Sequence, residues 1–551
     1  MRTAEFFLYD LPKFTTKNSL DHTRKLLGLL GDPCLNRKVI HVAGSNGKGS
    51  VCCFLYSMLL CAGKRAAMFT SPHLVDIRER FQVNGGMVSE EDFLLAFDRV
   101  KEASENLVQN NDNHPTFFEF IFAMAMVLFE KAGAEYIILE TGLGGRLDAT
   151  NSYPHPILSV ITSVSLEHTE ILGDTLAQIA AEKAGILKPG VPVVFLDEDP
   201  EAAEVIRSHA ERLGCPYCAV SCDSDADFRR TENSFPVQTH LSVSCKARTE
   251  TYKLFYICEI KENGIDFSFV TAYDRANDEG GASAAQQPAD CERNFSRQTD
   301  TLSDRCGIQP FTARVWNVTG HACWQAENAA LAVAAMRLLR LMPDDIIQQG
   351  LSVAVWPGRM QEVQPGIWFD GAHNPSGIAA FAQTVQRLTA EDPYPPLLVF
   401  SMVREKDIRT AVRLLTDEIS WAAIAVAAVP GERGVPPETL AELFREAIAS
   451  RTDGLTKASA SRTDGLTKAS ASRTDALTKA SAARTDSSAK TSATRTDSPV
   501  KAAAFLTPCP AEAFASPGAA LSAMRARQKP GQQLFCTGSL YFVGALLKDI
   551  Q

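Results

Sequence analysis

The sequence contains no long hydrophobic run, which excludes a protein built on membrane-spanning helices. No stretch of its 551 residues reaches the roughly 18 apolar residues that such a helix needs. The longest candidate, residues 117–129, is interrupted by Glu119 and therefore predicts a buried helix. The opening MRTAEFFLYDLPKF places acidic residues and a proline within a short apolar stretch, so we expect no secretory signal.

The sequence also lacks a cysteine spacing typical of disulfide frameworks and an excess of basic residues. The 14 cysteines follow no framework pattern, which is typical of free thiols in a reducing cytoplasm. Cys215 and Cys218 form a CPYC motif, but it follows a long helical stretch. We therefore favour two thiols beside a strand over a redox or zinc site. The net charge of −10, with no broad basic stripe, argues against nucleic acid or a membrane surface as a partner.

What is present is a regular alternation of strand-like and helix-like patterns over residues 18–220. The length predicts two or more domains, and a composition of 45% apolar and 22% charged residues is typical of globular proteins. The alternation predicts an α/β fold, a mostly parallel sheet with helices on both faces. Ligands bind such sheets beyond the carboxyl ends of the strands. We expect strands at 65–70, 135–140, 156–162 and 191–195, and helices at 18–30, 116–129 and 176–186.

The most informative stretch is Val39–Ser50, VIHVAGSNGKGS, in which a strand, a glycine-rich turn and a helix follow one another. Backbone N–H groups of such a turn point at a bound phosphate. Lys48 adds a charge for the outer phosphates, and the Ser50 hydroxyl suits Mg²⁺. The stretch departs from the common P-loop pattern at Val42 and Gly49. A glycine-rich turn with a surface lysine is the alternative.

Three titratable residues follow predicted strands or lie on the next helix. Glu140 ends a strand and offers the hard oxygen that Mg²⁺ prefers. His168 follows another strand end, where the alternative to a metal ligand is a hydrogen bond to Glu167 or to a carbonyl. Lys183 lies in a predicted helix, and the pattern by itself favours a solvated lysine.

The pattern changes after residue 220. Alternating segments at 239–247, 252–260 and 264–273 predict antiparallel strands, and the polar stretch 274–305 predicts a loop. Further on, an eleven-residue repeat begins at Arg451. Its single leucine per repeat is too little for a coiled coil, so it predicts a solvated, disordered insertion.

A second α/β region is expected beyond a hinge at 356–359, with strands at 367–369, 397–400, 422–428 and 534–536. Asp370 and His373 follow the first of these strands, where an acid and a histidine suit contact with a nucleotide. An Asx turn is the alternative.

These motifs resemble the folylpolyglutamate synthase/dihydrofolate synthase branch of the Mur ligase superfamily. The resemblance covers about residues 18–220 and 312–440 plus the C-terminal strand, and ETGLGGRLDATN and EKAGI are specific to the folate branch. The stretches that carry it lie at 41–50, 70–74, 77–84, 118–120, 140–151, 168–188, 325–328, 356–359 and 370–375.

The resemblance implies a cytoplasmic, monomeric two-domain ligase with ATP between the domains. Residues 1–355 would form a P-loop-containing, mostly parallel sheet domain of the Mur ligase type, with a variable insertion at about 221–312. Residues 356–551 would form a smaller Rossmann-like ligase domain, with the repeats inserted at about 449–501.

It also implies the reaction. The γ-phosphoryl group of ATP activates the carboxylate of dihydropteroate, of a reduced folate, or of both. The amine of L-glutamate then attacks the acyl phosphate and releases phosphate. Only small-molecule partners follow from this: dihydropteroate or folates, L-glutamate and ATP with Mg²⁺.

Site residues carry over by position. By resemblance Ser50, Glu140 and His168 bind magnesium at two sites, and Lys183 is carbamylated as a further metal ligand. The residues implied for ATP are Gly44, Ser45, Asn46, Gly47, Lys48, Gly49, Ser50, Asn328, Arg359 and Asp370. The catalytic set is Lys48, Lys183 and His373, and Ser71, His73, Arg78 and Phe118 border the pterin pocket.

Two alternatives stay open at this point. A Mur-type ligase acting on a cell-wall precursor is disfavoured by the folate-specific stretches. A nucleotide-binding regulator without catalysis is disfavoured by the presence of Lys48, Glu140, His168 and Lys183, which such a protein need not keep.

Overall fold

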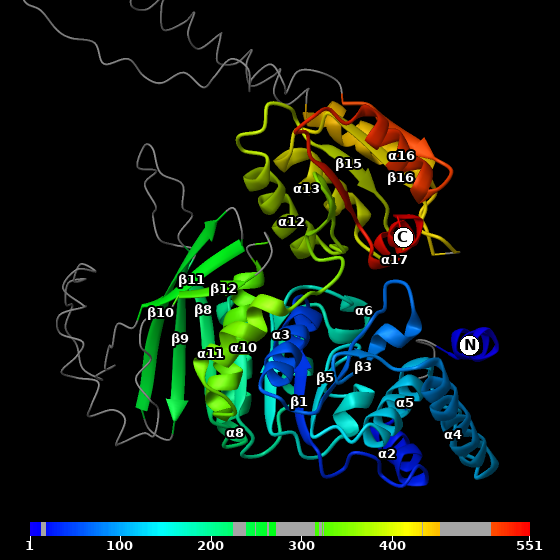
Figure 1. Cartoon of the computed structure of the whole chain (residues 1–551), viewed down its shortest axis with the longest axis vertical. Helices are drawn as coiled ribbons and strands as arrows, with labels where there is room; N and C mark the ends of the chain where they lie inside the picture. The colour runs from blue at the N-terminus through cyan, green and yellow to red at the C-terminus, as the bar shows by residue number, and fades with distance from the viewer. Residues whose placement is uncertain are drawn as a thin grey trace, which may run out of the picture. The chain divides into compact units, whose positions relative to one another are not determined.

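The computed structural model describes residues 1–12, 18–223, 239–247, 250–261, 264–270, 315–318, 322, 324–431, 433–451 and 509–550. They form two compact units, Met1–Arg359 and Met360–Gln551 (Figure 1). The domain functions and the boundary expected after residue 355 stay predictions. The polar stretch 274–305 and the repeats beyond Arg451 lie outside the described residues.

The first unit is built on a twelve-stranded sheet whose six central strands are parallel. This confirms the α/β prediction, and the strands begin or end within two residues of the expected ranges. In spatial order the central strands are β8 (Tyr217–Asp223), β7 (Val193–Asp197), β6 (Leu158–Ile161), β1 (Lys38–Ala43), β5 (Tyr136–Glu140) and β2 (Ala66–Phe69).

Antiparallel strands extend this sheet at both edges. The predicted strands after residue 220 are confirmed, and they continue the same sheet beyond β8. They are β9 (Thr239–Ala247), β10 (Glu250–Lys261) and β11 (Gly264–Val270), followed by β12 (Val315–Val318). The opposite edge holds β3 (Phe81–Val83) and β4 (Gly86–Met87).

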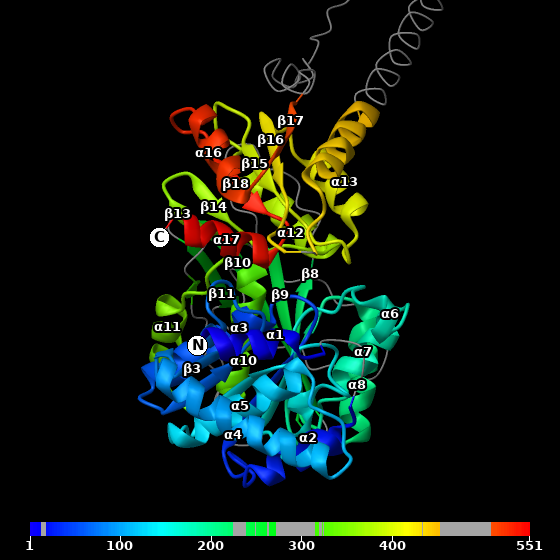
Figure 2. The same ribbon diagram turned by 90° about the vertical axis from the view of Figure 1, so that its right-hand side faces the viewer.

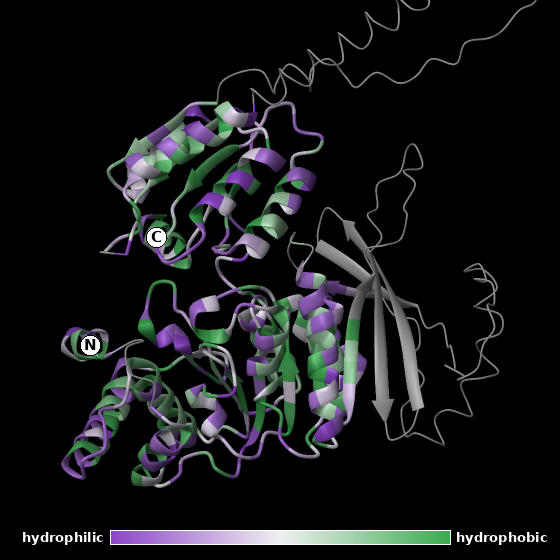
Figure 3. Ribbon diagram, turned by 180° about the vertical axis from the view of Figure 1, so that it is seen from behind, coloured by the Kyte–Doolittle hydropathy of each residue, from purple (hydrophilic) through white to green (hydrophobic). Residues whose placement is uncertain are grey.

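Helices cover both faces of the sheet, because successive residues of the buried strands are apolar on both sides. On β5, Ile138 packs toward one face, and Ile137 and Leu139 pack toward the other. One face carries α3 (Lys48–Cys61), α10 (Trp324–Leu339) and α11 (Asp344–Val353). The other carries α1 (Arg2–Asp10), α2 (Leu20–Leu29), α4 (Glu90–Gln109), α5 (Phe117–Lys131), α7 (Leu176–Ala184) and α8 (Pro200–Arg212) (Figure 2). Figure 3 shows the central strands largely in green, the colour of hydrophobic residues.

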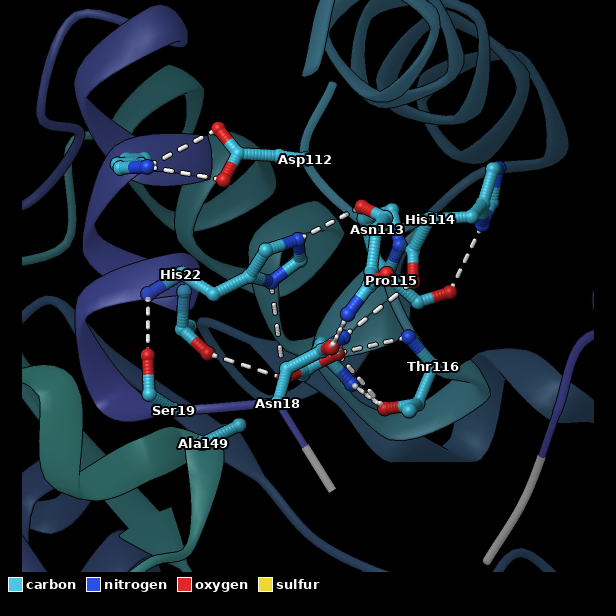
Figure 4. A network of polar contacts seen from close by, with 12 residues as sticks. Asn18, Ser19, His22, Asp112, Asn113, His114, Pro115, Thr116 and Ala149 are labelled. Carbon is cyan, nitrogen blue, oxygen red and sulfur yellow. Dashed lines mark hydrogen bonds and ion pairs between the residues drawn. The ribbon is translucent and has the colours of Figure 1, made fainter. Parts of the chain in front are cut away.

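The start of α5 is tied to α2 by a buried polar cluster (Figure 4). Glu119 accepts hydrogen bonds from the Thr116 amide at 2.7 Å and from Asn18 Nδ2 at 2.8 Å. His22 lies beside it on α2, with Nε2 2.8 Å from the Asn113 carbonyl oxygen. Ser19 caps α2 by accepting a hydrogen bond from the His22 amide. The cluster fixes the first turn of α5, which carries Phe117 and Phe118.

The second unit holds a six-stranded, mostly parallel sheet, and its four expected strands are confirmed. In order they are β13 (Gln361–Gln364), β14 (Ile367–Phe369), β18 (Leu534–Thr537), β15 (Leu397–Phe400), β16 (Ala423–Ala427) and β17 (Ala511–Phe514). Its helices are α12 (Pro375–Leu388), α13 (Ile408–Glu418), 437–451, α16 (Pro517–Arg527) and α17 (Leu540–Ile550). Among the described residues, no helix has both the length and the apolar character to cross a bilayer.

We predict that Glu119→Ala lowers the free energy of unfolding by about 2 kcal/mol, since it leaves the half-buried Thr116 amide and Asn18 side chain without the buried acceptor that they share. Urea denaturation of the full chain measures the change. Glu105→Ala is the control, because Glu105 is exposed on α4 and pairs with Lys101 only at 3.9 Å. Equal midpoints for both variants would contradict the anchoring role of Glu119.

Candidate functional site

The carboxyl ends of three neighbouring parallel strands bring the predicted site together. Strand β1 lies between β6 and β5, with Val42 opposite Glu140 and Ala43 opposite Ile161. The loops that follow these strands therefore leave the sheet at one edge. They carry the phosphate turn, Glu140 and residues 162–168.

The phosphate turn is held tightly against the end of β6. The Ser45 amide donates to the Ser163 carbonyl at 2.7 Å, and Thr162 Oγ1 donates to the Asn46 carbonyl at 2.6 Å. A Cβ at Gly44 would collide with the Thr162 side chain, so glycine is required there. Gly47 occupies the N-cap of α3 with φ of 85°, and without a side chain it leaves the first N–H groups of α3 to a ligand.

Lys48 is folded over its own turn. Its Nζ donates to the Gly44 carbonyl at 2.8 Å and to the Ser45 carbonyl at 3.0 Å. These carbonyls hold the ammonium against the turn, and a phosphate bound there would carry the opposite charge. Ser50 lies two residues further on, buried in the first turn of α3.

Two residues from later in the chain also reach the turn: Asn328 of α10, and Trp356 in the stretch that follows α11. A Cβ at Gly47 would collide with the Asn328 amide, so this side chain lies directly against the turn. A Cβ at Gly49 would lie 2.9 Å from the Trp356 ring. The structure thus places Asn328, which was predicted to contact ATP, beside the phosphate turn.

Glu140 is buried at the end of β5, and one of its oxygens accepts a hydrogen bond from the Ser71 amide at 2.9 Å. Burial raises the pKa of its carboxyl, while Lys48, the Ser71 amide and Arg359 act in the opposite direction. Lys48 and Arg359, both predicted to bind ATP, are therefore close enough to influence this carboxylate.

Lys183 is not the solvated lysine that the helical pattern favoured. Its side chain is 0% exposed, and Nζ donates to Glu167 Oε1 at 2.9 Å. Burial lowers the pKa of Lys183 to about 8, although Glu167 raises it. Burial also raises the pKa of Glu167, but Lys183 and Lys48 outweigh this effect and lower it to about 2. The pair is ionised at neutral pH, with an ammonium that loses its proton unusually easily.

His168 lies next to Glu167, but its own side chain is exposed. It has a left-handed backbone (φ 48°) and starts the short helix α6 (Thr169–Leu172). Within the described residues, no group of three or more histidine, cysteine, aspartate or glutamate side chains is arranged to hold a metal ion. The magnesium set Ser50, Glu140 and His168 stays a prediction.

The residues predicted for the pterin pocket lie in two segments, the one that follows β2 and the first turn of α5. Ser71 reaches Glu140 through its amide, and His73 Nδ1 accepts a hydrogen bond from Arg80 Nε at 2.9 Å. The Phe118 ring lies against Gly142, where a Cβ would approach it to 2.6 Å. Arg78 instead forms a two-pronged ion pair with Asp76, its neighbour in the chain.

In the second unit, Asp370 directly follows β14, and its side chain binds nearby backbone amides. Its oxygens accept hydrogen bonds from the Met360 and Ala372 amides, both at 2.8 Å. The bond to Ala372 is the Asx turn that the sequence left open. His373 Nδ1 lies 2.9 Å from the Gly371 carbonyl oxygen. Contact of Asp370 and His373 with ATP stays a prediction.

Sequence reasoning missed two residues that the site depends on. Glu167 was considered only as a partner of His168, yet it carries the counter-charge of Lys183. Asp148 accepts hydrogen bonds from the Gly142 and Leu143 amides, each at 2.9 Å, and so shapes the loop after Glu140. A polar residue within the ETGLGGRLDATN motif was the available signal for Asp148; for Glu167 there was none beyond its place after a strand.

Comparisons with known proteins agree with this arrangement. A family model described as the Mur ligase middle domain matches residues 42–256. The dihydrofolate synthase/folylpolyglutamate synthase of Bacillus subtilis (strain 168) is 32% identical over 420 residues, which is 75% of this chain and 82% of the relative. A probable bifunctional folylpolyglutamate synthase/dihydropteroate synthase of Haloferax volcanii is 32% identical over 445 residues, but this chain spans only 44% of it.

Solved structures share the fold over the whole chain. E. coli FolC in complex with DHPP and ADP superposes with a TM-score of 0.65 at 22% identity, covering 100% of this chain and 97% of that chain. Mycobacterium tuberculosis folylpolyglutamate synthase complexed with ADP and AMPPCP gives a TM-score of 0.68 at 20% identity, with 99% and 97% covered. Together with the folate-specific motifs and the site geometry, these matches show that the chain belongs to the dihydrofolate synthase/folylpolyglutamate synthase family of Mur ligases.

Proposed function

We propose that this chain is an ATP-dependent ligase that joins L-glutamate to dihydropteroate, to reduced folates, or to both through an acyl phosphate. The observation that carries the proposal is the meeting of a phosphate turn, the buried Glu140 and the buried Lys183–Glu167 pair at one edge of the parallel sheet. A phosphate cradle beside buried charges suits phosphoryl transfer, in which catalysis is chiefly positioning and electrostatic stabilisation.

ATP binding would rest on the turn itself. Bound phosphates would take the first N–H groups of α3, and Lys48 would exchange the Gly44 and Ser45 carbonyls for phosphate oxygens. Asn328 lies against the turn and the charge of Arg359 acts on Glu140, which supports a role for both in binding the nucleotide. The relatives solved with ADP or AMPPCP support this assignment.

The residues present fit a magnesium ion. Glu140 is a buried carboxylate with one oxygen facing the Ser71 amide, and Ser50 supplies a buried hydroxyl, so the donors are the hard oxygens that Mg²⁺ prefers. Ser50, Glu140 and His168 would hold it, and the bound ion would offset negative charge on the transferring phosphoryl group.

Lys183 fits the proposed carbamate for two reasons. Only a neutral amine reacts with CO₂, and burial lowers the pKa of this amine to about 8. The product would place a second carboxylate near Glu167, which is favourable only when a cation lies between them. A carbamylated Lys183 would therefore serve as a further magnesium ligand.

The remaining roles follow the predicted sets. Ser71, His73, Arg78 and Phe118 would border the pterin end of the acceptor. From the second unit, Asp370 would contact ATP and His373 would help to place the incoming glutamate. Monomeric state and cytoplasmic location belong to the same proposal.

Phosphate release tests the function. The full chain with ATP and Mg²⁺ is expected to release phosphate only when L-glutamate and dihydropteroate or tetrahydrofolate are both present. Assaying the two acceptors side by side determines which is used. If the protein binds ATP but releases no phosphate with either acceptor, the result would favour the nucleotide-binding regulator instead.

We predict that Lys48→Ala lowers kcat by at least about 100-fold, since a charge aimed at the transferring phosphate is lost. Steady-state phosphate release measures the loss, and circular dichroism checks that the fold is retained. Lys25→Ala is the control, because Lys25 is an exposed lysine of α2 that pairs with Asp112. Near-normal turnover by Lys48→Ala would refute the role.

We predict that Lys183→Ala loses activity and that short carboxylates such as formate or acetate restore part of it, by replacing the carbamate oxygens. Lys183→Gln, which cannot be carbamylated and carries no carboxylate, should be inactive and should show less rescue. A fully active Lys183→Ala enzyme would contradict the carbamate.

The same amine predicts a pH dependence. With a pKa of about 8, the neutral form falls from about half at pH 8 to a few per cent at pH 6.5. Enzyme depleted of CO₂ should therefore regain activity several-fold faster at pH 8 than at pH 6.5 when both samples are equilibrated with the same partial pressure of CO₂, so that the dissolved CO₂ is equal, and all samples are assayed at one pH. Equal recovery rates at both pH values would contradict the formation of a carbamate on the neutral amine of Lys183.

A further inference from the structure

We propose that Tyr9, on helix α1, is a positioning residue of the pterin pocket that acts through His73. The inference rests on the proposed function, because it concerns the acceptor site of that ligase. Tyr9 belongs to none of the motifs that identify the family, and its side chain is 43% exposed.

Four side chains from three segments form a closed ring of contacts. Tyr9 Oη lies 3.2 Å from His73 Nε2, and Arg80 Nε donates to His73 Nδ1 at 2.9 Å. The Arg80 guanidinium lies over the Phe117 ring, 5.5 Å from its centre. The Phe117 ring in turn stacks on Tyr9 at 6.1 Å with an interplanar angle of 16°. We name these residues, Tyr9, His73, Arg80 and Phe117, the aromatic ring cluster.

The cluster determines which nitrogen of His73 carries the proton. Arg80 Nε can only donate, so Nδ1 of His73 must accept and is unprotonated. A neutral imidazole then carries its proton on Nε2, which donates to Tyr9 Oη. Arg80 thus fixes the tautomer of His73, and Tyr9 holds the Nε2 side of the ring in place.

The orientation of His73 matters because its segment also reaches the reaction centre. Ser71, two residues earlier, donates its amide to Glu140 at 2.9 Å. Phe117, which stacks on Tyr9, immediately precedes Phe118 at the start of α5. Tyr9 therefore contacts both segments that are proposed to border the pterin, the one around His73 and the one around Phe118.

The docking of α1 does not depend on the Tyr9 side chain alone. Leu8 is fully buried, and Phe7 packs edge-on against Phe97 with ring centres 5.4 Å apart. A substitution at Tyr9 should therefore leave α1 in place, and its effect reports on the cluster.

The test is steady-state kinetics of the full chain with dihydropteroate, ATP and L-glutamate. Tyr9→Phe keeps the stacked ring and removes the oxygen, so we expect the KM for dihydropteroate to rise about fivefold, the effect of one lost hydrogen bond. The kcat and the KM for ATP should stay within twofold of wild type. Tyr9→Ala, which also loses the ring, should raise the same KM further.

A matched control and a double mutant separate positioning from general damage. Phe6→Ala removes an aromatic side chain that is 76% exposed on the same helix and should change none of the constants. In a His73→Ala background, Tyr9→Phe should have no further effect, since its partner is gone.

Three results overturn the inference: a Tyr9→Phe enzyme with wild-type constants, an equal rise in KM for ATP and for dihydropteroate, or an undiminished effect in the His73→Ala background. Wild-type enzyme that turns over neither folate acceptor would instead remove the proposed function, and the inference with it.

Discussion

Parallel pairing of β1 between β5 and β6 is the constraint on which the site depends. Because the strands run in one direction, the phosphate turn, Glu140 and the segment that carries Glu167 all emerge at one edge. The register then fixes their heights, with Val42 beside Glu140 and Ala43 beside Ile161. A slip of one residue would turn Glu140 to the opposite face of the sheet.

The buried charges at this edge are balanced by residues from separate segments. Lys183 comes from α7 and Glu167 from the loop after β6, while Lys48 comes from the turn after β1 and influences both Glu140 and Glu167. Each charge is tolerated in the interior because another segment supplies its partner. Loss of any one partner would leave an uncompensated charge, which makes the site sensitive to substitution at residues that touch no substrate.

The sequence predicted the sheet strands well because buried parallel strands are continuous apolar runs that end in polar turns. The phosphate turn was visible for the same reason, since its glycines and lysine are local in the chain. Lys183 was misjudged from the pattern alone because burial is a tertiary property: the helix looks ordinary until α7 packs on the sheet. Tyr9 and Glu167 were missed because their partners, His73 and Lys183, are brought near them by the fold and follow no spacing rule.

The contact between Gly47 and Asn328 links two helices that are far apart in sequence. Gly47 has a backbone that favours glycine, and the Asn328 amide occupies the space where any larger residue would extend. An engineer who wished to reshape the nucleotide preference of this protein could not vary these positions one at a time. They would have to be randomised as a pair in a combinatorial library, and the accepted pairs would reveal how much freedom α10 has to shift away from the turn.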